Sequence, residues 1–337
     1  MKFIKKAVVR SAFWHRVSEA YGGTPGISFR GGRHEELMRS TSGGFVAGIG
    51  SLNIALPPIL NLGSEALKQN LCRRFCREKL RLFAITEPGG GSDVASIKTT
   101  AVKDGDHYIL NGSKTFITSG CRKADQVTCV VRTGDQGAGG ISMIVVEKAR
   151  RVFPFPKTEK TGWWASDTAE LFFDNCRVPA ENLIGEENQG FYAIMINFQQ
   201  ERLALAVMAN MTARMALEES IKYAKQREAF GKPLTGFQVT RHKLADMATL
   251  VEASTEFTYR VAARIGAGVD QIKEVSMAKN FACSVSDKVT YDAVQLFGGY
   301  GYMREYIVER LYRDNRILSI GGGTTEIMKE IISKLMM

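Results

Sequence analysis

The sequence has little of the residue types that build metal centres and disulfide frameworks. Among its 337 residues are only four histidines, which lie far apart, and six cysteines. Cys72 and Cys76 are the only cysteines close together, and no second pair or nearby histidine completes a zinc set. We therefore predict no metal site, and we expect reduced, mostly structural cysteines, as in a cytosol-like compartment.

Long apolar runs are missing as well. No run reaches the roughly 18 residues that suggest a transmembrane helix, so we predict no stable membrane insertion. The formal charge is +10, but residues 1–80 hold 13 basic and 5 acidic side chains, and the remainder is nearly balanced. A nucleic-acid-binding surface over the whole fold is therefore not predicted.

The start of the chain, 1–16, is basic and contains no acidic residue. A transit-like or membrane-surface segment is one interpretation of this pattern. The interpretation that we favour is a surface helix with its apolar residues on one side, namely Phe3, Ile4, Val8 and Phe13.

Residue patterns predict an α+β chain of three domains in the order α, β, α. Helical patterns with glycine-rich joints indicate a helical domain over residues 1–81. Short β-branched and aromatic runs between turns indicate a β domain over 82–185. Helical periodicity then returns, and three long helices with a shorter one indicate a four-helix bundle over 186–337.

Punctuating residues predict particular elements within these domains. Pro57 and Pro58 mark a break, and Ser64 is the expected N-cap of the helix that follows. The dipeptide Asn111-Gly112 between two apolar runs predicts a hairpin. The expected glycine-rich joints are 21–26, 30–33 and 41–51, and the expected bundle helices are 199–232, 238–265, 271–296 and a short one after Thr324.

One carboxylate is notable because it lies near the start of the long helix predicted over 199–232. Glu201 stands beside Arg202 in an otherwise apolar run. In such surroundings a carboxylate can carry a raised pKa and act as a base near neutral pH. The alternative is a structural salt bridge between Glu201 and Arg202, and the helix pattern alone leaves both open.

The stretch 83–93, FAITEPGGGSD, holds three consecutive glycines. Three glycines allow a tight turn and close approach of a ligand to the backbone. The spacing is neither that of a phosphate loop nor that of a dinucleotide fingerprint. By itself the stretch is equally typical of a plain turn that leads into a strand.

Taken together, five motifs resemble the acyl-CoA dehydrogenase family over about residues 20–335. They are TEPGGGSD, NGSKTFITSG, REAFGKPL followed by Gln238, QLFGGYGY and GGGTTEIMKE. The resemblance implies a helical domain, a β-barrel domain and a four-helix bundle. It also implies an FAD enzyme of fatty acid metabolism and β-oxidation, which desaturates a fatty or branched acyl-CoA and passes electrons to an electron-transfer flavoprotein.

The resemblance also implies roles for residues at matching motif positions. Those matching cofactor-binding positions are Phe83, Ile85, Thr86, Gly91, Ser92, Phe116, Ile117, Thr118, Arg227, Phe230, Gln238, Gln295, Gly298, Gly299, Thr324 and Glu326. Those placed at the acyl-CoA site are Ser92, Gln199, Gln200, Arg202, Gly322 and Gly323. Many relatives have tryptophan where this chain has Phe116.

The catalytic base departs from the commonest family pattern. Many members carry it in a Tyr-Glu-Gly-Thr segment, where this chain has Gly321-Gly322-Gly323-Thr324. In the long-chain and isovaleryl-type branches the base lies in a Glu-Arg-Leu segment at the start of the long helix, and here that segment begins at Glu201. The resemblance therefore implies Glu201 as the base, and the backbone N–H of Gly322 as a donor to the thioester oxygen.

The spacing of two of these residues bears on assembly. Glu201 and Arg227 are 26 positions apart, which is about 39 Å along one unbroken helix. That exceeds the comfortable span of one flavin dinucleotide, so the two residues should serve different flavins. We predict a homo-oligomer, in line with the family habit of a homotetramer with shared cofactor sites.

Two regions depart from the family pattern, and rival functions stay open. The N-terminal helical domain is expected to be shortened, and residues 72–82 lack the usual family residues. Either departure makes an inactive or accessory subunit one alternative. An enoyl-CoA reductase or oxidase of the same fold is the other. The expected compartment is the cytoplasm, as in bacteria, with the mitochondrial matrix as the alternative.

Overall fold

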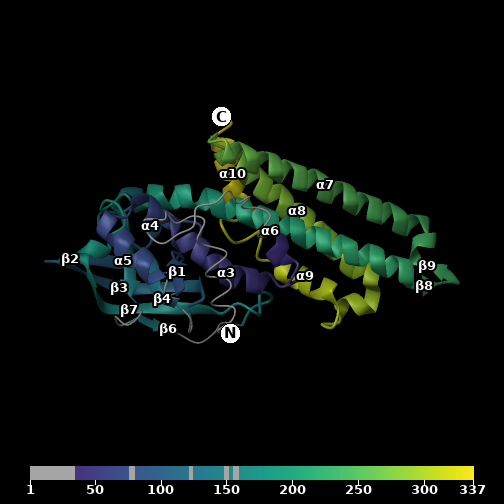
Figure 1. Cartoon of the computed structure of the whole chain (residues 1–337), viewed down its shortest axis with the longest axis horizontal. Helices are drawn as coiled ribbons and strands as arrows, with labels where there is room; N and C mark the ends of the chain where they lie inside the picture. Colours follow the sequence, from purple (N-terminus) through teal and green to yellow (C-terminus); the bar gives the residue numbers. More distant parts are fainter. Residues whose placement is uncertain (1–34, 76–79, 121–123, 148–151, 155–158) are drawn as a thin grey trace. The chain divides into compact units, whose positions relative to one another are not determined.

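The computed structural model describes residues 35–75, 80–120, 124–147, 152–154 and 159–337 (Figure 1). The described chain forms two compact units. The first includes residues 47–159 and 166–197, and the second includes 35–46, 160–165 and 198–337. The division into three domains stays a prediction.

The first unit is built on a seven-stranded sheet in the order β1-β4-β2-β3-β7-β6, with β5 paired to β4. The strands are β1 (Leu80–Ala84), β2 (Thr100–Asp104), β3 (His107–Thr118), β4 (Ala124–Arg132), β5 (Ile141–Glu147), β6 (Val152–Pro154) and β7 (Thr168–Pro179). The strand runs predicted in this region are confirmed. Among the described strands the pairing leaves β1 and β6 as ends, so it does not close the predicted barrel into a ring.

The predicted hairpin at Asn111-Gly112 is wrong, because β3 runs straight through both residues. Gly112 has a φ of +144° at a register shift between β3 and β7. A Cβ there would lie 2.6 Å from Thr99 Oγ1, so only glycine fits. The side chain of Asn111 accepts a hydrogen bond from Asn175 N at 2.7 Å on β7. The dipeptide therefore makes a β-bulge in place of a turn.

In the described part of the chain before the sheet lie the helices α3 (Gly43–Ala55), α4 (Pro57–Leu62) and α5 (Glu65–Phe75). The proline break is confirmed, and Ser64 Oγ accepts from Leu67 N at 3.2 Å, as expected of an N-cap. The glycine-rich joint predicted over 41–51 is wrong, because α3 occupies most of it. Gly43 and Gly44 serve close packing there, since a Cβ on either would lie within 3 Å of Trp163.

The second unit is helical. Its helices are α6 (Gly190–Gln226), α7 (Gln238–Gly266), α8 (Ile272–Phe297), α9 (Ile307–Asn315) and α10 (Thr325–Lys334). The first residues of α6 belong to the first unit. The strands β8 (Glu228–Ala229) and β9 (Lys232–Pro233) form a hairpin. Short 3-10 helices of the described chain are Val94–Ser96, Ala138–Gly140 and Ala180–Asn182 in the first unit, and Leu234–Gly236 and Gly298–Tyr302 in the second. In Figure 1, α6, α7 and α8 lie side by side, as the bundle prediction requires.

The boundaries of α6 differ from those predicted. The helix begins at Gly190 and ends at Gln226, and the hairpin β8–β9 takes up the rest of the expected span. Phe230 and Gly231 form the hairpin turn with φ values of +51° and +76°. The helix α9 was not predicted. Across α6 and α7, Asn210 Nδ2 donates to Thr258 Oγ1 at 2.9 Å, and Ser254 Oγ donates to Asn210 Oδ1 at 2.6 Å.

Some predictions lie outside the described residues. They are the basic helix carrying Phe3, Ile4, Val8 and Phe13, the joints at 21–26 and 30–33, and the side chains of Cys72, Cys76 and Cys121. Cys129, Cys176 and Cys283 are buried and form no disulfide. Within the described ranges, no helix is both long enough and apolar enough to cross a membrane.

Candidate active site

Glu201 lies on α6 in the second unit, half-buried by surface area but closely surrounded by protein atoms. This burial raises the pKa of its carboxyl to about 7, although the charges of Arg202 and Lys279 act in the opposite direction. In the part of the chain that the structure describes, no cationic nitrogen lies within 4.0 Å of the carboxylate. The alternative of a direct Glu201–Arg202 salt bridge is therefore not what the geometry shows.

The glycine loop between α9 and α10 lies against Glu201. Gly322 has a φ of +66°, which favours glycine. A Cβ on Gly322 would lie 2.5 Å from Leu205 Cδ1 and 3.8 Å from Glu201 Oε1. The Glu201 carboxylate therefore lies close to where a side chain at position 322 would begin. A carboxylate carried by residue 201 and one carried by residue 322 would therefore occupy neighbouring positions in the site.

Two buried cations hold this loop. Arg202 Nε donates to Gly322 O at 3.1 Å, and Lys279 Nζ donates to Gly323 O at 2.6 Å. Both side chains are buried, and burial lowers the pKa of each. Because a trans peptide points its C=O and the following N–H in opposite directions, the N–H groups of Gly323 and Thr324 face away from these cations.

Backbone donors of the loop are available to a ligand. Within the described ranges, no protein acceptor is bonded to the N–H of Gly322, Gly323 or Thr324. Thr324 itself caps α10, since its Oγ1 accepts from Ile327 N at 3.3 Å, and Glu326 is exposed in the first turn. A carboxylate with a raised pKa thus lies beside unpaired N–H donors, which is an arrangement suited to removing a proton next to a carbonyl group.

Lys279 is a site residue that sequence reasoning missed. The signal in the sequence was one charged residue in the run 275–285, VSMAKNFACSV, whose other residues are uncharged. We expect Lys279→Met to slow the reaction of the site by about 10–100-fold, because a charged hydrogen bond to the loop is lost. Since the charge of Lys279 lowers the pKa of Glu201, the midpoint of the pH–rate profile should also move to higher pH.

The measurement for Lys279→Met is the pH–rate profile, with Lys273→Met as the control. Lys273 lies on the same helix but is partly exposed and pairs with Glu274 at 3.6 Å. An unchanged rate and midpoint in Lys279→Met would mean that this lysine only fills the core.

A second group of candidate residues gathers at the other end of the helical unit. Figure 1 shows α10 and the hairpin β8–β9 at opposite ends of α7 and α8. Arg227 directly follows α6, and its guanidinium lies 5.8 Å from the ring centroid of Tyr300. The side chains of this group are mostly exposed, and its members are Arg227, Phe230, Gln238, Gln295, Gly298 and Gly299. The helix α6 runs without a break from Glu201 to Gln226, directly before Arg227, so the distance predicted from an unbroken helix applies.

A third group lies in the first unit, on two neighbouring segments. Phe83 lies near the end of β1, followed by Ile85, Thr86, Gly91 and Ser92. Phe116, Ile117 and Thr118 end β3. The segments are joined, because Thr115 N donates to Thr86 O at 2.8 Å. The side chains of Ile85 and Ile117 are buried, whereas that of Phe116 is 68% exposed.

Each of the last two groups, taken by itself, has chemistry that suits part of a flavin dinucleotide. Exposed aromatic side chains are suited to contact a flat ring, and Phe116 is 68% and Phe230 96% exposed. Arg227 offers an exposed cation to a pyrophosphate. Gly298 and Gly299 have no atom within 4 Å of a would-be Cβ, so a ligand can approach their backbone closely.

Comparison with protein family models identifies the family of this chain. The model described as Acyl-CoA dehydrogenase, C-terminal domain, matches residues 188–337. The model described as Acyl-CoA dehydrogenase, middle domain, matches residues 82–176. The chain belongs to the acyl-CoA dehydrogenase family. The resemblance predicted from the five motifs is confirmed, and so is the order of helical, β and helical regions.

Curated relatives align with most of the length of this chain. An acyl-CoA dehydrogenase of Bacillus subtilis is 41% identical over 100% of this chain and 89% of its own. The long-chain specific acyl-CoA dehydrogenase of Sus scrofa is 42% identical over 84% of this chain and 66% of its own. A subunit of a caffeyl-CoA reductase–Etf complex from Acetobacterium woodii is 37% identical over 87% and 79%.

Solved structures of family members share the fold. A probable acyl-CoA dehydrogenase from Mycobacterium abscessus has a TM-score of 0.95 at 45% identity, covering 100% of this chain and 91% of that one. An acyl-CoA dehydrogenase of Bacillus anthracis complexed with FAD has a TM-score of 0.91 at 32% identity, covering 99% and 62%. The protein is therefore an oxidoreductase of the acyl-CoA dehydrogenase fold.

Proposed function

We propose that this protein is an FAD-dependent acyl-CoA dehydrogenase, which converts a fatty or branched acyl-CoA to the trans-2-enoyl-CoA. The observation that carries the proposal is Glu201, a carboxylate with a pKa of about 7 beside the unpaired N–H groups of the glycine loop. The proposed acceptor of the electrons is an electron-transfer flavoprotein. A relative from a reductase–Etf complex and a solved structure named for an electron transferring flavoprotein support that partner class.

In this proposal the chain's own residues handle the proton and the thioester. Glu201 takes the α-proton, which is only weakly acidic. The N–H of Gly322 donates to the thioester oxygen and stabilises the negative charge that develops there. FAD, when bound, supplies the group that accepts the β-hydrogen as a hydride. Arg202 and Lys279 hold the loop so that its N–H groups keep their direction.

Binding roles follow the three groups described above. The residues proposed to hold FAD are Phe83, Ile85, Thr86, Gly91, Ser92, Phe116, Ile117, Thr118, Arg227, Phe230, Gln238, Gln295, Gly298, Gly299, Thr324 and Glu326. Those proposed to line the acyl-CoA site are Ser92, Gln199, Gln200, Arg202, Gly322 and Gly323. The separation of Glu201 and Arg227 along α6 supports a homo-oligomer, for which we propose a tetramer.

The proposal predicts a rate that rises with pH. Only the ionised carboxylate can accept a proton, and the pKa of Glu201 is about 7. The rate of flavin reduction by substrate should therefore increase as pH rises through about 7 and then level off. Rapid-mixing measurements of flavin reduction across that range test this, and a rate that falls through neutrality would contradict it.

The function itself is tested by the visible spectrum of the purified protein. We expect flavin bands that bleach when acyl-CoAs of increasing chain length are added without oxygen, and the bleaching length class names the substrate range. Flavin that resists every acyl-CoA but is oxidised by an enoyl-CoA after reduction would favour the reductase alternative, which the caffeyl-CoA reductase relative supports. A protein that takes up no FAD would favour an accessory subunit. The proposed compartment is the cytoplasm.

A further inference from the structure

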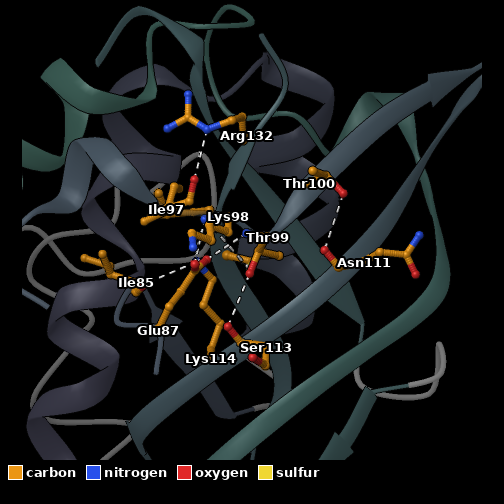
Figure 2. Close-up of polar contacts among 12 residues, drawn as sticks. Ile85, Glu87, Ile97, Lys98, Thr99, Thr100, Asn111, Ser113, Lys114 and Arg132 are labelled. Carbon is orange, nitrogen blue, oxygen red and sulfur yellow. Dashed lines mark hydrogen bonds and ion pairs between the residues drawn. The ribbon is translucent and has the colours of Figure 1, made fainter. Parts of the chain in front are cut away.

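Two oppositely charged side chains of the first unit are buried against each other, and neither has a role in the site described above. Glu87 is 8% exposed and Lys114 is fully buried, and Lys114 Nζ lies 2.8 Å from Glu87 Oε1. Figure 2 shows the pair at the centre of a set of polar contacts. Burial alone would raise the pKa of Glu87, but Lys114 and further donors outweigh it, so the pKa is lowered and the carboxylate stays ionised.

Further contacts of the pair are with backbone groups. Glu87 accepts from Lys98 N at 2.6 Å and from Thr99 N at 2.9 Å. Lys114 Nζ also donates to Ile85 O at 2.9 Å. The pair therefore ties together three segments: the turn after β1, the turn before β2 and the middle of β3.

The turn before β2 is itself held from its far side. Arg132 Nε donates to Ile97 O at 2.9 Å, as Figure 2 shows, and Thr99 Oγ1 donates to Ser113 O at 3.2 Å. The turn that Glu87 contacts is therefore itself fixed by hydrogen bonds. Through its ion pair with Glu87, Lys114 connects this fixed turn to β3.

The effect on β3 is visible directly after Lys114. Thr115 donates its N–H to Thr86 O in place of a partner on β7, and the β3–β7 register shifts between Lys114 and Ile117. The next residue, Phe116, has a φ of +59° and a side chain that is 68% exposed. A bulky residue in the left-handed region is strained and persists only where its surroundings determine the backbone.

The location of this strain connects the pair to the cofactor. Thr115 and Phe116 form a bulge, and bulges near active sites re-aim side chains. Phe116, Ile117 and Thr118 on one side, and Ile85 and Thr86 on the other, are the residues proposed to contact the flavin.

A buried ion pair is weak evidence for stability as such, because apolar residues of the same size often replace it without loss.

We propose that Glu87 and Lys114 are positioning residues that fix the bulge at Thr115 and Phe116, and that this bulge holds both segments in the conformation that binds the flavin ring. The inference rests on the proposed function for its ligand. The first part of the inference, that the pair determines the bulge, depends only on contacts within the first unit.

The test uses the full-length protein with the double substitution Glu87→Gln and Lys114→Met. The glutamine side chain keeps one oxygen, which can accept from the N–H of Lys98 or of Thr99 but not from both as the two carboxylate oxygens do. Methionine fills the volume of lysine, and neither buried charge remains, so the fold is expected to survive. We expect the apoprotein of this variant to bind FAD at least about tenfold more weakly than the wild type. Amide hydrogen exchange of the apoprotein should become faster over residues 112–118.

Lys103→Met is the matched control, because Lys103 is an exposed residue of β2 in the same sheet. It should change neither FAD affinity nor exchange over 112–118. Should the double variant fail to fold by circular dichroism, the single substitution Glu87→Asp decides, with the same two measurements and the same expected directions, because it keeps both charges but shortens the acidic side chain by one methylene group.

The outcomes separate this inference from the proposed function. Unchanged exchange over 112–118, or FAD affinity within about twofold of wild type, overturns the inference while leaving the function intact. Wild-type protein that binds no FAD contradicts the proposed function, and exchange in the apoprotein then still shows whether the pair determines the bulge.

Discussion

Replacing Glu201 with glutamine is expected to slow the reduction of bound flavin by acyl-CoA about 10³-fold, the typical worth of a positioned general base. The carboxyl lies beside the unpaired N–H donors of the glycine loop, and its pKa of about 7 suits it to take a proton at neutral pH. Glutamine has nearly the same shape but cannot accept that proton. FAD content and acyl-CoA affinity should therefore remain close to wild type.

Glu218→Gln is the control for this substitution. Glu218 lies on the same helix, is exposed, and should give wild-type rates when changed. The measurement is anaerobic rapid mixing of holoprotein with acyl-CoA, followed at the flavin band. A Glu201→Gln protein that reduces its flavin at the wild-type rate would show that another group is the base.

The second large effect is on stability and concerns Lys114→Met made alone. Removing one partner of a buried ion pair leaves the other charge uncompensated, which typically costs about 3–5 kcal/mol. Glu87 would stay buried with only the N–H donors of Lys98 and Thr99. We expect the free energy of unfolding in urea to fall by about this amount, whereas Lys103→Met should stay within about 0.5 kcal/mol of wild type.

Addition of Glu87→Gln to Lys114→Met should recover much of the lost stability, because the buried charge is then gone. A Lys114→Met protein as stable as the wild type would mean that water or a shifted side chain compensates Glu87. In that case the contacts of the pair would not determine the local backbone.

Much of the fold could be predicted from local patterns. The β-branched runs of β4, β5 and β7 and the periodicity of α7 and α8 depend on nearby residues only, and their positions are confirmed. Ser64 caps its helix as expected, because a cap is also a local feature, and the short helix expected after Thr324 is present.

The failures come from glycines whose neighbours are distant in sequence. The sequence predicts a turn at Gly112, but this glycine makes room for Thr99 within a continuous strand. The sequence predicts a joint at Gly43 and Gly44, but these glycines make room for Trp163. Glycine allows both turns and close packing, and the sequence pattern does not distinguish the two.

The candidate site was predictable in its motifs but not in its supports. Glu201 stands out as a lone acid in an apolar helix, and the motif order points to its partners. Lys279 and the Glu87–Lys114 pair act through backbone carbonyls and N–H groups far along the chain, and such contacts leave no spacing pattern.

The central claim is that Glu201 removes the α-proton, and exchange of that proton with solvent tests it most directly. A 3,3-dimethylacyl-CoA has α-hydrogens but no β-hydrogen, so hydride transfer cannot follow. Incubated in D₂O with the holoprotein, it should gain deuterium at the α-carbon with wild-type protein and with Glu218→Gln, but not with Glu201→Gln, as read by mass spectrometry. Exchange by Glu201→Gln at the wild-type rate would contradict the claim.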